Sequence, residues 1–307
     1  DILLVTGDIS LYEMIAKAVF SQYDIPFYVN TRKNISDNPL MQFIISILDI
    51  YIWDYSYQHM TRFFKSIYSN LTEKESFELE NYILKWGISG KTVWHTVWDY
   101  ENSSYDIKMN ELRLSVIQFL DLFFDSIKGG CTAETFANNL YQLTEKMKVS
   151  EKIEKLSLYM NNDEIEQSKQ CYNSFIDILD QLVIITENEK KTAEYFLNIL
   201  KTAFLEETVG VTPMTKDCVF LTSSSRTDIV DYDTVFILGA NDGSFPMTVN
   251  YNNLLNDSDY DLLKENGYEI NSNPKEKIDD QEYIMFTLLQ SPNNYLYLSY
   301  CINNPEG

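Results

Sequence analysis

The sequence has few of the residues from which metal sites, nucleophilic sites and membrane spans are built. Its two histidines, His59 and His95, belong to no metal-binding motif and to no serine–histidine pair. No apolar run reaches the length of a membrane-spanning helix, and no signal peptide is recognisable. Neither a GxxxxGKS/T phosphate loop nor a GxGxxG turn after a strand is present. We therefore predict no membrane association, no metal site and no catalytic residue in this chain.

Cysteine is also scarce, and its spacing fits neither a CxxC motif nor a zinc site. The four cysteines are Cys131, Cys171, Cys218 and Cys301. Each lies in an apolar segment, so we expect buried thiols that are not paired in disulfides. Reduced thiols indicate a reducing compartment, and we expect a cytoplasmic protein.

Cations are outnumbered by acidic residues, with 24 Lys and Arg against 46 Asp and Glu, which gives a net charge of -22. Proteins that bind nucleic acid usually carry a basic surface, because neutralising phosphates supplies much of the affinity. We therefore expect weak DNA binding by this chain alone, unless a local basic patch or a basic partner contributes. Adjacent acids such as Asp279 and Asp280 are interpreted as solvated surface that keeps the protein soluble.

Strand and helix patterns alternate at both ends of the 307 residues, a length typical of about two domains. Apolar runs at 2–6 and 26–29 are each followed by a helical pattern. Ser10 is the predicted N-cap of the first helix, and Pro39 opens the second. Strand patterns return at 219–222, 235–239 and 295–300. This alternation predicts a parallel α/β sheet.

The middle of the chain has helical patterns only. They cover residues 73–86, 107–128, 132–147, 150–160, 163–186 and 190–205. Because each end has too few strands for a sheet of its own, we predict one sheet domain split by a helical insertion. The predicted sheet domain comprises residues 1–51 and 206–307, and the insertion comprises residues 52–205. Since the chain opens within a strand and without Met, we expect it to be part of a larger protein.

One loop has an unusual composition for its position. The segment GANDGSFP at 239–246 follows a strand, and its two glycines permit a tight turn. Loops at the carboxyl ends of parallel strands form ligand sites in α/β proteins. The residues alone leave two interpretations open, a ligand-binding loop and a turn that only packs. Arg226, before the same strand, is likewise either a ligand contact or a structural ion-pair partner.

Several segments resemble the AddB (RexB) subunit of the bacterial AddAB helicase–nucleases. They are YDIPF at 23–27 with NPL at 38–40, ENYIL at 80–84, VFILGANDGSFP at 235–246 and YLSY at 297–300. The segment at 235–246 is the most specific. Asn38 departs from the pattern, since the family usually has His there. Together the segments span nearly the whole chain.

This resemblance implies the second RecA-like domain of a superfamily-one helicase, split by a large helical insertion. It also implies a parent protein with an N-terminal Walker A domain and a C-terminal nuclease domain. The parent family uses ATP, Mg and an iron–sulfur cluster, whereas no cofactor is expected in this chain. The implied partners are an AddA-type helicase–nuclease subunit and single-stranded DNA. Recognition of the recombination sequence Chi is a further implied role.

Two departures from active helicases bear on mechanism. Such helicases usually have an arginine after the first strand of this domain and another before its last strand. Gly7 and Gln290-Ser291 occupy about those places. Since an arginine finger contributes ~10³–10⁵ in rate, we predict a DNA-handling scaffold that is not a motor. The alternatives are an active helicase domain that needs its missing first half, with Arg32 supplying the charge, and a protein-docking module only.

The candidate DNA contacts share a position in the strand-exit loop or in a small basic cluster. They are Arg226, Asn241, Asp242, Gly243, Phe245, Arg32 and Lys33. The ring of Phe245 has two interpretations, stacking on a base or burial in the core.

Overall fold

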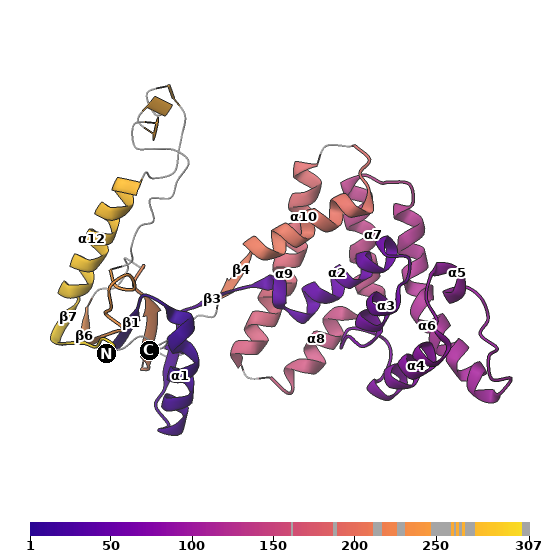
Figure 1. Cartoon of the computed structure of the whole chain (residues 1–307), viewed down its shortest axis with the longest axis horizontal. Helices are drawn as coiled ribbons and strands as arrows, with labels where there is room; N and C mark the ends of the chain where they lie inside the picture. Colours follow the sequence, from indigo (N-terminus) through magenta and orange to yellow (C-terminus); the bar gives the residue numbers. More distant parts are fainter. Residues whose placement is uncertain are drawn as a thin grey trace. The chain divides into compact units, whose positions relative to one another are not determined.

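The computed structural model describes most of the chain as two separate units. The described residues are 1–160, 162–186, 189–210, 217–225, 231–246, 259–260, 262–263, 266–267 and 274–302, with side chains left out at 163 and 274–277. One unit comprises Asp1–Thr31 and Thr212–Gly307, and the other comprises Arg32–Val211. Figure 1 shows the parallel strands in the first unit and most of the helices in the second.

The sheet unit contains a five-stranded parallel sheet in the order β2-β5-β1-β6-β7. Its strands are β1 (Ile2–Thr6), β2 (Phe27–Val29), β5 (Val219–Ser223), β6 (Tyr232–Leu238) and β7 (Pro292–Leu298). The central strand β1 pairs with β5 on one side and β6 on the other, so Leu3 lies between Phe220 and Val235. The prediction that the two ends of the chain share one parallel sheet is confirmed.

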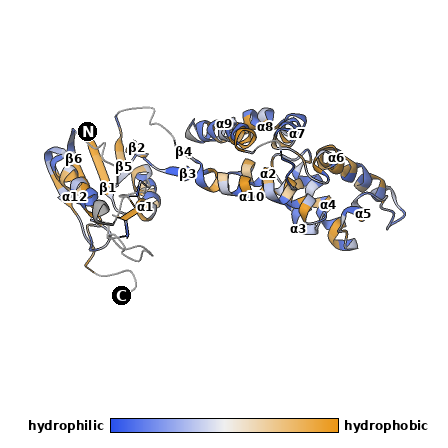
Figure 2. Cartoon of the chain, turned by 90° about the horizontal axis from the view of Figure 1, so that it is seen from above, coloured by the Kyte–Doolittle hydropathy of each residue, from blue (hydrophilic) through white to orange (hydrophobic). Residues whose placement is uncertain are grey.

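Two helices pack on this sheet. Helix α12 (Pro274–Gln290) buries Ile284 and Leu288 in a cluster with Val5 and Ile237. The central strand β1 is drawn in the orange of apolar residues in Figure 2. Helix α1 (Ile9–Gln22) lies by β2, where the ring centroids of Phe20 and Phe27 are 5.4 Å apart.

The N-cap of α1 differs from the prediction. Asp8, and not Ser10, caps the helix, because its Oδ1 accepts hydrogen bonds from the backbone N of Ser10 (3.0 Å) and Leu11 (3.4 Å). Only two residues, Gly7 and Asp8, therefore separate β1 from the helix. Asp and Ser are comparable N-caps, so composition alone did not distinguish the two positions.

The second unit is built from helices. They are α2 (Pro39–Ile52), α3 (Tyr57–Phe64), α4 (Glu73–Trp86), α5 (Lys91–Trp94), α6 (Ser104–Ile127), α7 (Ala133–Lys146), α8 (Val149–Ser157), α9 (Asn162–Ile185) and α10 (Ala193–Glu206), preceded by the short 3-10 helix η1 (Ile35–Asp37). One large core joins them, and within it the rings of Phe136 and Phe196 stack with centroids 4.2 Å apart.

The boundary between the units lies earlier than residue 51. The strands β3 (Arg32–Asn34) and β4 (Thr208–Gly210) pair antiparallel and open and close the helical unit. Helix α2, assigned from sequence to the sheet domain, belongs to the helical unit, and ten of its fourteen residues are buried. A helix that is apolar on nearly all sides needs neighbours all round, and other helices supply them here.

The cysteines divide into two groups. Cys131 and Cys171 are buried as expected, whereas Cys218 is partly exposed and Cys301 is exposed. Cys301 lies beyond the end of β7, so its apolar neighbours do not bury it. No disulfide joins the described cysteines. Among the described residues, no helix combines the length and apolar character that crossing a membrane requires.

Candidate functional site

The loop that leaves β6 at residues 239–246 is fixed to the chain beyond β7. The backbone N of Ala240 donates to Ser299 O at 2.7 Å, which extends the sheet by one more pairing. Asn241 continues it with its side chain, because its Nδ2 donates to Cys301 O and its Oδ1 accepts from Cys301 N, both at 2.9 Å. The side-chain amide of Asn241 thus pairs with the backbone of Cys301 as a neighbouring strand would, and the two bonds attach the loop to the chain beyond β7.

The far end of this loop closes over the end of β1. A Cβ added to Gly7 would lie 1.9 Å from the carbonyl oxygen of Ser244, a separation that real atoms do not reach. The backbone of Ser244 therefore fills the space that a side chain at residue 7 would need. This is the place where the resemblance to active helicases calls for an arginine.

The start of the loop is crowded by α1. A Cβ on Gly239 would lie 2.6 Å from the hydroxyl oxygen of Tyr12, and Gly239 has a φ of +66°. Burial raises the pKa of Tyr12, and the nearby thiol of Cys301 adds to the rise. Tyr12 is therefore a neutral phenol at neutral pH, and it packs against a turn that requires glycine.

The other predicted loop residues have contrasting positions. Asp242 and Gly243 are exposed at the tip, where Gly243 has a φ of +82°. Phe245 is only 7% exposed and packs with Val5 and Ile237 in the sheet core, so its ring is not placed to stack on a base. Arg226 lies outside the described residues.

The predicted basic cluster belongs to the other unit. Arg32 and Lys33 are exposed on β3, at the start of the helical unit. Neither side chain forms an ion pair or a hydrogen bond with any part of the chain that the structure describes. They are available to a ligand, but they do not belong to the loop at 239–246.

The described side chains of the sheet unit offer few positive charges to a phosphate. Among its described side chains the only lysine or arginine is Lys17, which pairs with Glu13. The exposed part of the loop can therefore contact a ligand through backbone N–H groups and the polar tip. No group of three metal-ligating side chains occurs within the described ranges.

A second polar cluster, in the helical unit, was not found from the sequence. Asp49 on α2 lies 3.6 Å from Nη1 of Arg62 on α3 and 3.5 Å from Nζ of Lys201 on α10. The available signal was a polar residue at every third or fourth position of an otherwise apolar helix, Gln42, Ser46 and Asp49. Lys201 is 152 residues away from Asp49, so only the fold joins them.

Comparison with curated proteins gives matches along the whole chain. The chain is 33% identical over 311 residues to the AddB subunit of the ATP-dependent helicase/deoxyribonuclease of Clostridium novyi (strain NT), with all of the chain covered. It is 31% identical over 326 residues to the protein of the same name from Clostridium tetani. This chain is homologous to AddB. It spans 27–28% of the length of these relatives.

No protein-family model matches this AddB-like chain. The segments that carry the resemblance nevertheless have clear places in its fold. VFILGANDGSFP forms most of β6 and the loop closing over Gly7, and ENYIL lies on α4, where Tyr82 and Ile83 are buried. The α/β architecture with a helical insertion agrees with the expectation from the sequence.

Proposed function

We propose that this AddB-like chain is a helicase-like, non-motor scaffold that handles DNA within an ATP-dependent nuclease. The nuclease processes double-strand breaks in recombinational repair, in the cytoplasm. The alignment of the whole chain with subunits that are named for helicase and deoxyribonuclease activity supports the DNA-processing role. The non-motor role rests on one observation, the packing of Gly7 against the backbone of Ser244.

Phosphoryl transfer needs positive charge at the transferred phosphate, and an arginine finger is worth ~10³–10⁵ in rate. Residue 7 can carry no side chain where Ser244 lies. Ser291 lies at the second expected arginine position, directly after α12. Its side chain is buried, and its hydroxyl donates a hydrogen bond to the carbonyl oxygen of Leu288 at 2.8 Å. Neither position supplies a cation to ATP.

In the whole enzyme, other parts carry ATP, Mg and the iron–sulfur cluster, and an AddA-type helicase–nuclease subunit drives translocation. The chain contributes a rigid sheet with an exposed loop tip at Asp242 and Gly243, next to the path of a single strand. Recognition of Chi by the parent subunit is part of this proposal.

A docking role is a second candidate, compatible with the first. Helix α1 exposes apolar side chains of Leu11 (59%), Met14 (79%) and Ile15 (58%) to solvent. Apolar groups gathered on one exposed helix face indicate a contact with other parts of the enzyme. An active helicase domain that uses Arg32 has no comparable support, since Arg32 lies in the helical unit.

A charge added at the loop tip tests the DNA-handling role in the complete two-subunit enzyme. Asp242→Lys should tighten the binding of oligo(dT). The slope of log affinity against log salt concentration should steepen by about 0.7 for each additional phosphate that the loop neutralises. The matched control is Asp279→Lys on α12, which makes the same charge change at another exposed site. Equal effects of the two variants would contradict a strand path along the loop. Hydrolysis of ATP by the complete subunit without its partner would contradict the non-motor role.

A further inference from the structure

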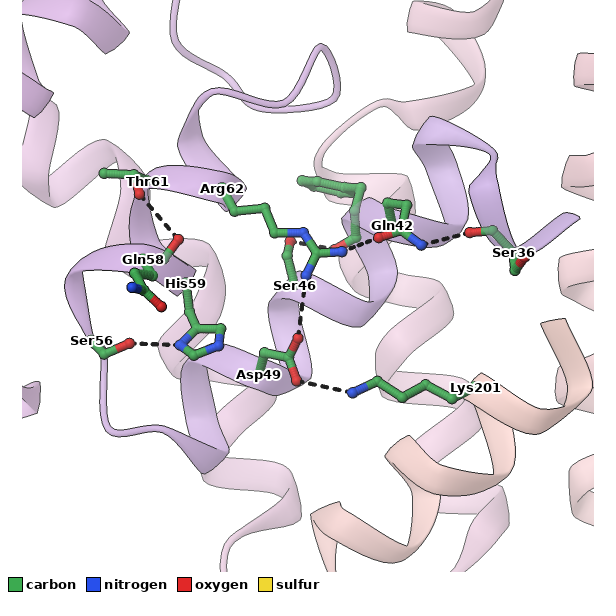
Figure 3. A network of polar contacts seen from close by, with 11 residues as sticks. Ser36, Gln42, Ser46, Asp49, Ser56, Gln58, His59, Thr61, Arg62 and Lys201 are labelled. Carbon is green, nitrogen blue, oxygen red and sulfur yellow. Dashed lines mark hydrogen bonds and ion pairs between the residues drawn. The ribbon is translucent and has the colours of Figure 1, made fainter. Parts of the chain in front are cut away.

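Helix α2 carries one polar stripe on a mostly buried surface. Gln42, Ser46, Asp49 and Trp53, its C-cap, are spaced by four, three and four residues, which places them on one face. The helices α3 and α10 meet this face, and Figure 3 shows Arg62 and Lys201 converging on Asp49. The stripe therefore brings three helices to one polar site.

The charges at this site do not balance. The side chain of Asp49 is 6% exposed and faces two cations, Arg62 and Lys201, whose side chains remain 43% and 44% exposed. Several other lysines of the helical unit pair with one carboxylate each, as Lys65 does with Glu80 at 2.6 Å. One carboxylate between two cations leaves a local positive charge at the surface of a chain whose net charge is -22.

Arg62 is held in place by a second contact, and both cations keep N–H donors free. Arg62 donates to Gln42 Oε1, and Gln42 Nε2 in turn donates to Ser36 O at 2.6 Å. A guanidinium has five N–H donors and an ammonium three, so donors remain for an oxyanion at the exposed side. Because the guanidinium of Arg62 is already positioned by Gln42 and Asp49, little of its side-chain entropy is lost when it binds a ligand.

A large, exposed aromatic ring follows Asp49 on the polar stripe of α2. Trp53 is 60% exposed and lies one helical turn, ~5.4 Å along the axis, beyond Asp49. Its ring stacks on His59, with centroids 6.0 Å apart and planes 9° apart, and His59 precedes Arg62 by one turn of α3. The Nδ1 of His59 hydrogen-bonds Ser56 Oγ at 2.6 Å, which fixes the imidazole.

A fixed aromatic ring beside cations with free donors is how single-stranded DNA is bound without regard to sequence. A clamp between helices would not need the exposed indole, and the single carboxylate of Asp49 balances only one of the two cations. We infer that Trp53, Arg62 and Lys201 form a single-stranded DNA contact on the helical unit. A base stacks on Trp53, and the adjoining phosphates meet Arg62 and Lys201. The ligand class rests on the proposed DNA-handling function.

The test uses the complete two-subunit enzyme with fluorescent oligo(dT) as the probe. Trp53→Ala should weaken binding about 5- to 150-fold, the effect of losing one stacked base. The triple variant Asp49→Asn, Arg62→Gln, Lys201→Gln removes the charges without leaving a buried carboxylate unpaired. In this variant the slope of log affinity against log salt concentration should become shallower by about 0.7 for each phosphate that is no longer neutralised.

The matched control is Trp86→Ala with Lys85→Gln on α4. Trp86 is 36% exposed, and its neighbour Lys85 pairs with Glu101 at 2.6 Å, so no charge is left over there. This variant should bind oligo(dT) as the unmodified enzyme does. Circular dichroism and thermal unfolding verify that each variant is folded.

Unchanged oligo(dT) affinity in folded Trp53→Ala and in the triple variant would overturn the inference. Loss of the partner subunit with DNA binding retained would overturn it too, and would assign the surface to protein docking. If these variants have no effect while Asp242→Lys tightens binding, the proposed function stands without this contact. If Asp242→Lys also has no effect, the proposed function fails as well.

Discussion

The carbonyl oxygen of Ser244 lies 1.9 Å from the position that a β-carbon on Gly7 would take. Residue 7 directly follows β1, and residue 244 belongs to the loop after β6, so the contact joins the exits of two neighbouring strands. Only a glycine allows the loop to close there. The contact ties the conformation of the loop to the absence of a side chain at residue 7.

Replacing Gly7 should therefore open the loop. Gly7→Ala is expected to cost about 1–3 kcal/mol of unfolding free energy in the sheet unit, because overpacking forces backbone to move. Hydrogen exchange at residues 239–246 should rise at the same time. Gly87→Ala is the control, since its Cβ meets open space and only the left-handed φ of +62° is strained. Equal exchange in Gly7→Ala and the unmodified chain would contradict the close contact.

The side chain of Asn241 should act as a structural group. Asn241→Asp keeps an acceptor for Cys301 N but has no donor for Cys301 O, so it places a carboxylate against a carbonyl. We expect a loss of about 1–3 kcal/mol in denaturant unfolding. Asp242→Asn, at the exposed neighbouring position, should change stability little. If both variants unfold alike, the loop is held by other contacts.

Lys152 should make the helical unit more stable at alkaline pH. Its Nζ donates to the carbonyls of Tyr68 and Ser69, both at 2.9 Å, and to Asn70 Oδ1 at 2.7 Å. Burial lowers the pKa of Lys152 to about 8, and Lys155 adds to this. The unfolded chain, with a lysine pKa of about 10.4, then binds more protons between pH 8 and 10.4, so stability rises with pH in that window.

The measurement is the unfolding free energy of the unmodified chain minus that of Lys152→Met, followed from pH 7 to 10.5. This difference should grow as pH rises through 8. Lys169→Met, at an exposed position of α9, is the control variant. A difference that is constant with pH would mean that Lys152 titrates normally.

The cysteines should differ sharply in reactivity. Cys301 is exposed and should react first with a maleimide under native conditions. Burial raises the pKa of Cys131, and it raises the pKa of Cys171 to about 11, so both remain protonated and shielded. Peptide mass spectrometry should find these two modified only after denaturation. Modification of Cys171 at the rate of Cys301 would contradict its burial.

Local signals in the sequence determined the secondary structure well. The pattern at 73–86 coincides with α4, because Thr72 and Glu75 form a capping box and Gly87 ends the helix with a φ of +62°. The strand patterns at 2–6 and 235–239 were sufficient to place both ends of the chain in one parallel sheet. The glycines of the loop at 239–246 also marked a tight turn before its contacts were known.

The sequence by itself thus determined most of the elements, the split α/β architecture and the family resemblance, since these depend on short-range periodicity and capping. The short elements α3, α5, β3 and β4 were not predicted. Only the tertiary structure decided which unit buries α2, because an apolar helix can pack in either. It also decided that Asn241 holds Cys301 and that Lys201 reaches Asp49. Such pairs lie far apart in the chain, and no local pattern encodes the partner of a side chain whose contacts form only on folding.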